Sequence, residues 1–132
     1  MGVFDSMRIL LVEPDRLQAG IFTEALRRDG HEVAHAVSAQ DAVHAADEAM
    51  PDVVILELQL PHHNGIEFLY EFRSYAEWLH IPVVVHTYVP RHELTPAATM
   101  RRELGVVRVL YKPATSLGQL CTAVRALAPA VP

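Results

Sequence analysis

The amino-acid sequence predicts an α/β domain in which helices cover both faces of a parallel five-stranded sheet. Short apolar runs alternate five times along the chain with segments that have the apolar periodicity of a helix. Alternation of this kind predicts βα units joined by right-handed crossovers. The third apolar run, Val53–Leu56, is continuous and rich in β-branched residues, which is typical of a central strand buried on both faces.

The first part of the chain predicts two strands, each followed by a helix. Arg8–Val12 is the first strand, and Asp15 can cap the helix that follows it. The inward face of this helix is expected to hold Leu17, Ile21, Phe22, Ala25 and Leu26. Gly30 is a natural stop for the helix. Glu32–Ala36 is a more polar strand, which favours a position at the sheet edge, and Ala39 to about Ala49 is the second helix.

After the central strand, the pattern predicts a third helix and a fourth strand. Gly65 opens the helix, and Arg73 is expected to lie in water at its far end. The inward face of this helix is expected to hold Ile66, Phe68, Leu69 and Phe72. Ile81–Val85 is the predicted fourth strand, and it runs out towards Thr87.

The last part of the chain predicts a helix, a strand and a final helix. Pro96 is expected at the first position of the fourth helix, which ends near Gly105. Val106–Tyr111 is the fifth strand, and a capping box that begins at Ser116 opens the last helix. The apolar stripe of that helix is Leu117, Leu120, Val124 and Leu127.

Length and composition indicate one compact domain and exclude several classes of protein. A chain of 132 residues can bury a core without disulfides, and it contains no apolar run of the ~18 residues that would span a membrane. The net charge of −5 and the absence of a basic run argue against direct binding of nucleic acid. The single cysteine, Cys121, fits a cytoplasmic location and is expected to be a small core residue.

Polar side chains follow four of the five predicted strands. Glu13, Glu57, Thr87 and Lys112 come at the ends of the first, third, fourth and fifth strands. Ligands of open α/β sheets bind at the carboxyl ends of the strands, so we expect these side chains to meet there. A carboxylate at the end of a buried strand is costly unless it is paired, and we therefore expect an ion pair between Glu57 and Lys112. The chain has no glycine-rich motif for a dinucleotide or for a P-loop.

Four segments in this order and spacing resemble the receiver domain of bacterial two-component response regulators. They are ILLVEPD, PDVVILELQLPHHNG, IPVVVHTY and GVVRVLYKP. The resemblance implies a flavodoxin-like, doubly wound sheet with strand order 2-1-3-4-5 and helices on both faces. It implies one receiver-like domain over residues 1–132, with a core from about 8 to 127.

The resemblance also implies roles for the residues at the strand ends. In the family, an aspartate that ends the third strand accepts a phosphoryl group, and two acids after the first strand hold Mg²⁺. A Ser or Thr and a Lys-Pro pair contact the phosphoryl group, and the bond before this proline is usually cis. These positions correspond to Thr87, Lys112 and Pro113, and the first acid corresponds to Glu13.

The sequence departs from the family pattern at four positions. Glu57 stands in place of the phosphoacceptor aspartate, and Pro14 in place of the second acid. Tyr88 replaces the small residue after the Thr, where its ring could cover the site, and Val109 replaces an aromatic residue of the fifth strand. Misplacing a reacting group by ~1 Å can cost ~100-fold in rate, and Mg²⁺ requires octahedral ligands. We interpret the site as degenerate, with no cofactor, no metal and no useful affinity for Mg²⁺.

The predicted function is that of a pseudo-receiver: a non-enzymatic signalling domain that acts through protein contacts independently of phosphorylation. The expected partner is a histidine kinase, an output domain or another signalling protein. The expected contact face is formed by the fourth helix, fifth strand and fifth helix. One alternative is a working phosphoacceptor that uses Glu57, and another is a small-ligand or flavin-binding flavodoxin-like protein. The pathway, the oligomeric state and membership in a larger regulator stay open, as does whether Glu57 mimics the phosphorylated state.

Four histidines that follow or end predicted strands suggest a metal hypothesis. They are His62, His63, His86 and His92. The sequence has no helical pair of histidines and no His/Cys group with the spacing of a metal site. We therefore interpret these four residues as solvated loop histidines.

Overall fold

The computed structural model describes residues 6–128. The strands in this range form a single five-stranded sheet. All strand pairs are parallel, and the strand order is β2-β1-β3-β4-β5, which confirms the predicted fold. The strands are β1 (Arg8–Val12), β2 (Glu32–Ala36), β3 (Val53–Leu56), β4 (Val83–Thr87) and β5 (Val106–Tyr111). The fourth strand begins two residues later than predicted because Pro82 has no N–H group to pair in the sheet.

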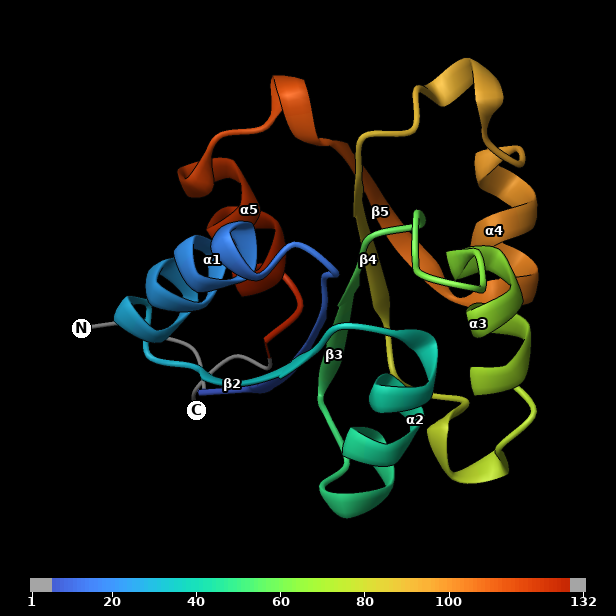
Figure 1. The fold of residues 1–132 in the computed structure, drawn as a ribbon, viewed down its shortest axis with the longest axis horizontal. Coiled ribbons are helices and arrows are strands. Elements are labelled where there is room, and N and C mark those ends of the chain that lie inside the picture. The colour runs from blue at the N-terminus through green and yellow to red at the C-terminus, as the bar shows by residue number, and fades with distance from the viewer. Residues whose placement is uncertain (1–5, 129–132) are drawn as a thin grey trace.

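Helices cover both faces of the sheet, as Figure 1 shows, with α1 and α5 on one side and α2, α3 and α4 on the other. The α-helices are α1 (Arg16–Arg28), α2 (Ala39–Glu48), α3 (Gly65–Phe72), α4 (Ala97–Leu104) and α5 (Leu117–Arg125). Short 3-10 turns occur at η1 (Ala76–Trp78), η2 (Arg91–Glu93) and η3 (Lys112–Ala114). None of the helices in residues 6–128 is long and apolar enough to cross a lipid bilayer.

The sheet separates two apolar cores. Successive residues of a strand point to opposite faces. Ile55 therefore packs with α1 and α5, and Val54 and Leu56 pack with the three helices on the other face. Every residue of β3 is buried, as expected for the central strand, and β2 lies at the predicted edge.

The helix ends follow the predicted capping signals with one correction. Asp15 accepts a hydrogen bond from the backbone N–H of Gln18 at the start of α1, and a capping box at Ser116 opens α5. Pro96 is the residue before the first helical residue of α4, so its prediction as the first helical residue is wrong. Its ψ angle of 139° is not helical. Gly105 ends α4 with a φ angle of +68°, a conformation that favours glycine.

Three apolar residues that were predicted to face inward are exposed. Leu17 is 78% exposed, and Ile21 is also exposed. Both lie two positions from the buried Ala19, which is roughly 200° around the helix and so on its far side. Leu117 is exposed because it is the first residue of α5, where no preceding turn of helix shields it.

Arg73 was expected in water, but its side chain is partly buried against backbone carbonyl groups. The guanidinium donates hydrogen bonds to the carbonyl oxygens of Trp78 at 2.7 Å, Ile81 at 2.5 Å and Leu104 at 2.9 Å. These carbonyls come from η1, from the approach to β4 and from the end of α4. The burial of Arg73 was not predicted, because the tertiary fold brings these carbonyl groups to it and the sequence around Arg73 does not indicate them. A side chain at Gly105 would collide with the guanidinium, so this close approach also requires glycine.

Candidate functional site

The carboxyl ends of four strands bring together the polar residues predicted to meet there. We call this group the strand-end site: Glu13, Glu57, Thr87 and Lys112. All four are buried, with Glu13 2%, Glu57 3% and Lys112 9% exposed. Thr87 is the last residue of β4, and the other three directly follow β1, β3 and β5. The parallel arrangement of the strands places these ends at one edge of the sheet.

Lys112 lies between the two carboxylates of the strand-end site. Its Nζ is 3.0 Å from Oε1 of Glu57, the ion pair expected from the sequence, and 2.5 Å from Oε1 of Glu13. The second pair was not predicted, because sequence order does not show which of two acids a lysine reaches. Two buried carboxylates share one ammonium group, so the ionised triad carries one net negative charge.

Both carboxylate oxygens of Glu57 accept hydrogen bonds. Oε2 accepts from the Thr87 hydroxyl and from the backbone N–H of Gln59 at 3.1 Å. Oε1 faces Lys112 and accepts from the backbone N–H of Tyr88 at 3.3 Å. Burial by itself raises the pKa of Glu57, but the hydrogen bonds from Thr87, Lys112 and Gln59 outweigh it and lower the pKa below 4.5. Glu57 is therefore a fully hydrogen-bonded carboxylate anion at neutral pH.

Aromatic rings enclose the ammonium group of Lys112. Nζ lies 4.8 Å from the ring centroid of Tyr88 and 5.8 Å from that of Phe22, which is within the range of cation–π attraction. The side-chain amide of Gln18 on α1 donates a hydrogen bond of 3.0 Å to the Tyr88 hydroxyl. The Tyr88 ring thus joins the β4 end to α1 across the site. Gln18 was not singled out from the sequence, because its spacing to Tyr88 carries no pattern.

The segment after β1 offers one carboxylate to the strand-end site. Pro14 has no side-chain ligand atom, as the sequence requires. The Asp15 carboxylate accepts the capping hydrogen bond from Gln18 N at 3.0 Å and is exposed. The backbone N–H of Asp15 donates to Oε2 of Glu13 at 3.0 Å. Both Glu13 oxygens therefore have partners, one in the backbone and one in Lys112.

Two further departures from the family pattern concern Pro113, which follows Lys112, and Val109 in β5. No peptide bond between residues 6 and 128 is cis, so the cis bond implied before Pro113 is not present. Lys112 to Ala114 form a 3-10 turn, and the fixed φ angle of Pro113 fits such a turn. Val109 is partly buried in β5 and lines a groove beside α5.

Of the four histidines considered for a metal site, His86 was interpreted wrongly as a solvated loop residue. It is a buried β4 residue whose ring meets that of Phe22 edge-on, with centroids 4.8 Å apart. Burial and the nearby Lys112 ammonium lower the pKa of His86 to about 4, so the ring is neutral. His62, His63 and His92 are exposed. In residues 6–128, no three His, Cys, Asp or Glu side chains are grouped as metal ligands.

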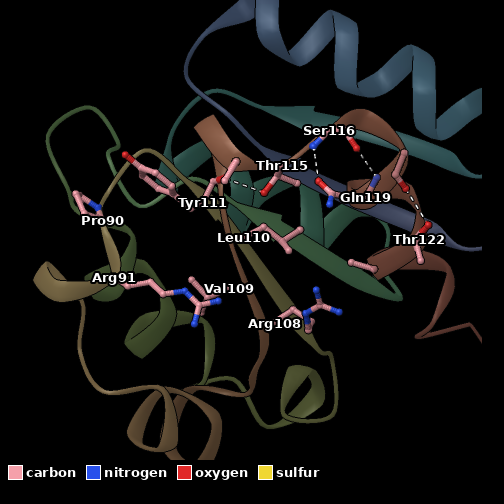
Figure 2. A pocket seen from close by; sticks show the side chains of 13 residues that line it. Pro90, Arg91, Arg108, Val109, Leu110, Tyr111, Thr115, Ser116, Gln119 and Thr122 are labelled. Atoms are coloured by element: carbon pink, nitrogen blue, oxygen red, sulfur yellow. Dashed lines mark hydrogen bonds between the residues drawn. The ribbon is translucent and has the colours of Figure 1, made fainter.

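A groove of about 840 Å³ lies between β5 and α5, close to the strand-end site. Figure 2 shows Arg91, Arg108 and Val109 on one side of it and Gln119 and Thr122 on the other. This groove was not predicted from the sequence, because the residues that line it come together only in the folded chain.

The sheet order, with acids ending the first and third strands and a threonine and a lysine ending the fourth and fifth, defines a receiver-type signalling domain. The family model of the response regulator receiver domain matches residues 9–125, and the chain belongs to this family. Fold similarity extends to solved receiver structures. A CheY-like receiver domain from Methylobacillus flagellatus has a TM-score of 0.79 and 24% identity, and it covers 93% of this chain and 99% of its own. CheY4 from Vibrio cholerae gives 0.80 and 22%, with the same coverage.

Curated relatives match over part of their length. The transcriptional regulatory protein PdtaR of Mycobacterium tuberculosis is 33% identical over 107 residues, which is 80% of this chain and 49% of PdtaR. The polar-differentiation response regulator DivK of Brucella ovis is 29% identical over 79 residues, covering 60% of this chain and 64% of DivK. The chain thus spans about half of PdtaR and less than two thirds of DivK.

Proposed function

We propose that this receiver domain signals through protein contacts without being phosphorylated, and that it has no enzymatic activity. The observation that supports this proposal is the pairing of Lys112 with both Glu13 and Glu57 inside a buried site. In the family pattern, a lysine at this position contacts the phosphoryl group. In this chain the two glutamates occupy it.

The proposal includes the absence of functional Mg²⁺ binding. Glu13 is the sole acid of the family's metal pair, because Pro14 replaces the other. The Glu13 carboxylate already contacts Lys112 and the backbone N–H of Asp15. A metal ion would have to separate a buried ion pair and then complete an octahedral shell with one fewer carboxylate. We therefore assign no cofactor to the domain.

The environment of Glu57 also supports a phosphorylation-independent mode. A nucleophilic carboxylate needs one oxygen free to approach phosphorus in line with the leaving group. Here Oε2 accepts from Thr87 and Gln59, and Oε1 faces Lys112 and the Tyr88 N–H. The Tyr88 ring, half-exposed on its outer side, lies over the ammonium that would otherwise attract a phosphodonor.

For the partner, we propose another signalling protein: a histidine kinase, an output domain or a separate regulator in the cytoplasm. The proposed contact face consists of α4, β5 and α5. Ordinary receivers switch this face with an aromatic side chain of the fifth strand that rotates. Val109 stands at that position and cannot rotate in this way, which supports a contact face that stays near one signalling conformation. Glu57 supplies a permanent negative charge, although one carboxylate has less charge and fewer acceptor oxygens than a phosphoryl group.

The test is incubation of the purified chain with acetyl phosphate and Mg²⁺, followed by intact mass spectrometry. The proposal expects an unchanged mass. A stoichiometric gain of about 80 Da, the mass of HPO₃, that is absent in Glu57→Gln would overturn it and establish Glu57 as a working phosphoacceptor. An ordinary aspartate receiver treated in parallel shows that the phosphodonor is active.

A further inference from the structure

A second pocket, of about 370 Å³, lies between the loop that follows β3 and the segment that follows β4. Both connections leave the sheet at the edge that holds the strand-end site. The apolar residues that line the pocket are the buried Leu58 and the partly buried Leu60, Ile66, Val89 and Leu94. These residues belong to or pack against the core beneath α2, α3 and α4, which gives the pocket an apolar floor. The volume is in the range of sites for small organic molecules.

The loop that forms one wall of this pocket is held in a fixed shape. Gln59 and Asn64 form an antiparallel bridge across its two ends. The Gly65 N–H donates a hydrogen bond of 2.7 Å to the Leu58 carbonyl, and a Cβ atom at Gly65 would lie 2.7 Å from Cα of Leu58. Because this wall is already formed, a ligand would not have to order it on binding.

The charges around the pocket favour a cation. Among the described residues that line it, Glu93 is the only acid, and none is Lys or Arg. Glu93 is exposed, and its ion-pair contact is with the neighbouring His92, at 3.6 Å. The start of α3 would by itself attract an anion, but the Glu67 carboxylate of the capping box closes it. Residues 41–77, which include this wall, contain eight Asp and Glu and one Arg, and such an excess attracts positively charged ligands.

Two residues of the pocket are hydrogen-bonded to the strand-end site through their backbone. The Gln59 N–H donates to Oε2 of Glu57 at 3.1 Å, and the Val89 N–H donates to the Thr87 hydroxyl oxygen at 3.1 Å. A ligand that contacts Gln59 and Val89 would therefore act directly on groups that hold the buried carboxylate of Glu57 in place.

We propose that this pocket binds a small amine, in which one ammonium group is attached to an apolar ring or branched chain. The apolar part would lie against Leu60, Ile66 and Val89. The ammonium group would pair with Glu93 and donate hydrogen bonds to an imidazole of His62 or His63. The inference goes beyond the proposed function and does not depend on it, because it adds a small-molecule ligand next to the strand-end site.

The experiment titrates the full chain with three probes of the same size and different charge: 2-phenylethylamine, 2-phenylethanol and 3-phenylpropionate. Methyl NMR of the Leu, Ile and Val side chains follows binding at about pH 8, where an ordinary histidine is uncharged and an alkyl ammonium is protonated. Glu93→Gln removes the charge of the pocket, and Thr95→Phe fills it. Glu103→Gln is the matched control, because Glu103 is an exposed acid of α4 that does not line the pocket. Thermal unfolding of each variant verifies that it is folded.

We expect 2-phenylethylamine to shift the methyl signals of Ile66, Val89 and Leu94. A ligand of about nine non-hydrogen atoms should bind with a Kd of roughly 1 mM or tighter. The Kd of the amine should rise by roughly threefold in Glu93→Gln and by roughly tenfold in Thr95→Phe, and should not change in Glu103→Gln. 3-Phenylpropionate should bind more weakly than 2-phenylethanol, and 2-phenylethanol more weakly than the amine.

Three results would overturn the inference. They are no shift at the pocket methyls with the amine, binding of 3-phenylpropionate as tight as that of the amine, and equal amine affinity of Glu93→Gln and the native protein. None of these results changes the acetyl-phosphate test, whose readout is the mass of the chain, so the proposed function stands or fails separately.

Discussion

Glu13 and Lys112 are 99 residues apart in the sequence, yet Nζ of the lysine lies 2.5 Å from Oε1 of the glutamate. The lysine also pairs with Glu57, so it neutralises one of two buried carboxylates that would otherwise repel each other. A buried pair is not a strong source of stability by itself, but removing one partner leaves an uncompensated charge. The triad is therefore most sensitive to loss of the single ammonium group.

Replacing Lys112 with methionine should lower the free energy of unfolding by about 3–5 kcal/mol, because both glutamates lose their buried counterion. Urea unfolding at pH 7 measures the effect. Arg108→Met is the matched control, since Arg108 is exposed and unpaired among the described residues, and it should change stability by less than about 1 kcal/mol. Equal stability of Lys112→Met and the native protein would show that the pairing is not energetically important.

Restoring the family residues should restore phosphorylation. In the triple variant Pro14→Asp, Glu57→Asp, Tyr88→Ala, the second metal acid returns, the nucleophile retracts by one C–C bond, and the ring over Lys112 is removed. We expect Mg²⁺ binding by calorimetry and a mass gain of about 80 Da with acetyl phosphate.

Glu57→Asp alone is the control for this reconstruction. It should stay unmodified, because Pro14 still denies the metal a carboxylate ligand. Phosphorylation of the single variant would mean that glutamate geometry, and not the missing metal ligand, is what disables the site.

His86 should make the protein less stable as the pH falls. Burial, followed by the Lys112 charge, lowers the pKa of His86 from 6.5 to about 4. Between these values the unfolded chain binds a proton that the native chain does not, so stability is lost as pH decreases through this window, by up to about 3 kcal/mol. Glu57, whose pKa is lowered, loses its contribution to stability as the pH falls below the ordinary glutamate range, which overlaps the lower end of this window.

The measurement compares urea unfolding of the native protein and His86→Phe at several pH values from 7.5 to roughly 4.5. Phenylalanine keeps an aromatic ring against Phe22, so it removes the titration more than the packing. His31, whose pKa is also lowered mainly by burial, is present in both proteins and cancels in the difference. Identical pH dependence in both proteins would contradict the prediction.

Arg73 and Gly105 should act as one structural unit. Arg73→Met removes three strong hydrogen bonds to carbonyl oxygens and should cost about 2–4 kcal/mol of stability, measured by chemical unfolding. Gly105→Ala should cost at least about 1 kcal/mol, because its φ angle is positive and its Cβ meets the guanidinium. The two losses should not add in the double variant, since the collision disappears when Arg73 is removed. Full additivity would show that the two residues act separately.

The strands and helices could be predicted from the sequence because each of their signals is local. Apolar runs such as Val53–Leu56 and caps such as Ser116 depend on neighbours within a few residues. The strand order came from the family resemblance, and it placed Glu57 and Lys112 at one edge of the sheet. The pairing of Lys112 with Glu57 followed from the cost of burying a carboxylate.

The features that were not predicted depend on which distant side chains meet in the folded chain and on which side of a helix a residue lies. The second partner of Lys112, the Gln18–Tyr88 hydrogen bond and the carbonyls around Arg73 all join segments that are distant in sequence. Leu17 was misplaced because it was assigned to the packed face by its apolar side chain, although its position is on the far side of α1 from the buried Ala19. His86 was misplaced because the predicted fourth strand ended two residues too early, which left a residue of β4 assigned to the following loop.

The position of Lys112 after the last strand has a consequence for partly assembled forms of the sheet. Strands β1 and β3 pair directly with each other and not through β5, and their pairing brings Glu13 and Glu57 to adjacent strand ends. Until β5 docks on β4, these two acids have no shared cation, and partly assembled sheets carry an unrelieved repulsion. Docking of β5 relieves it, so the ion triad favours completion of the sheet over accumulation of a four-stranded intermediate.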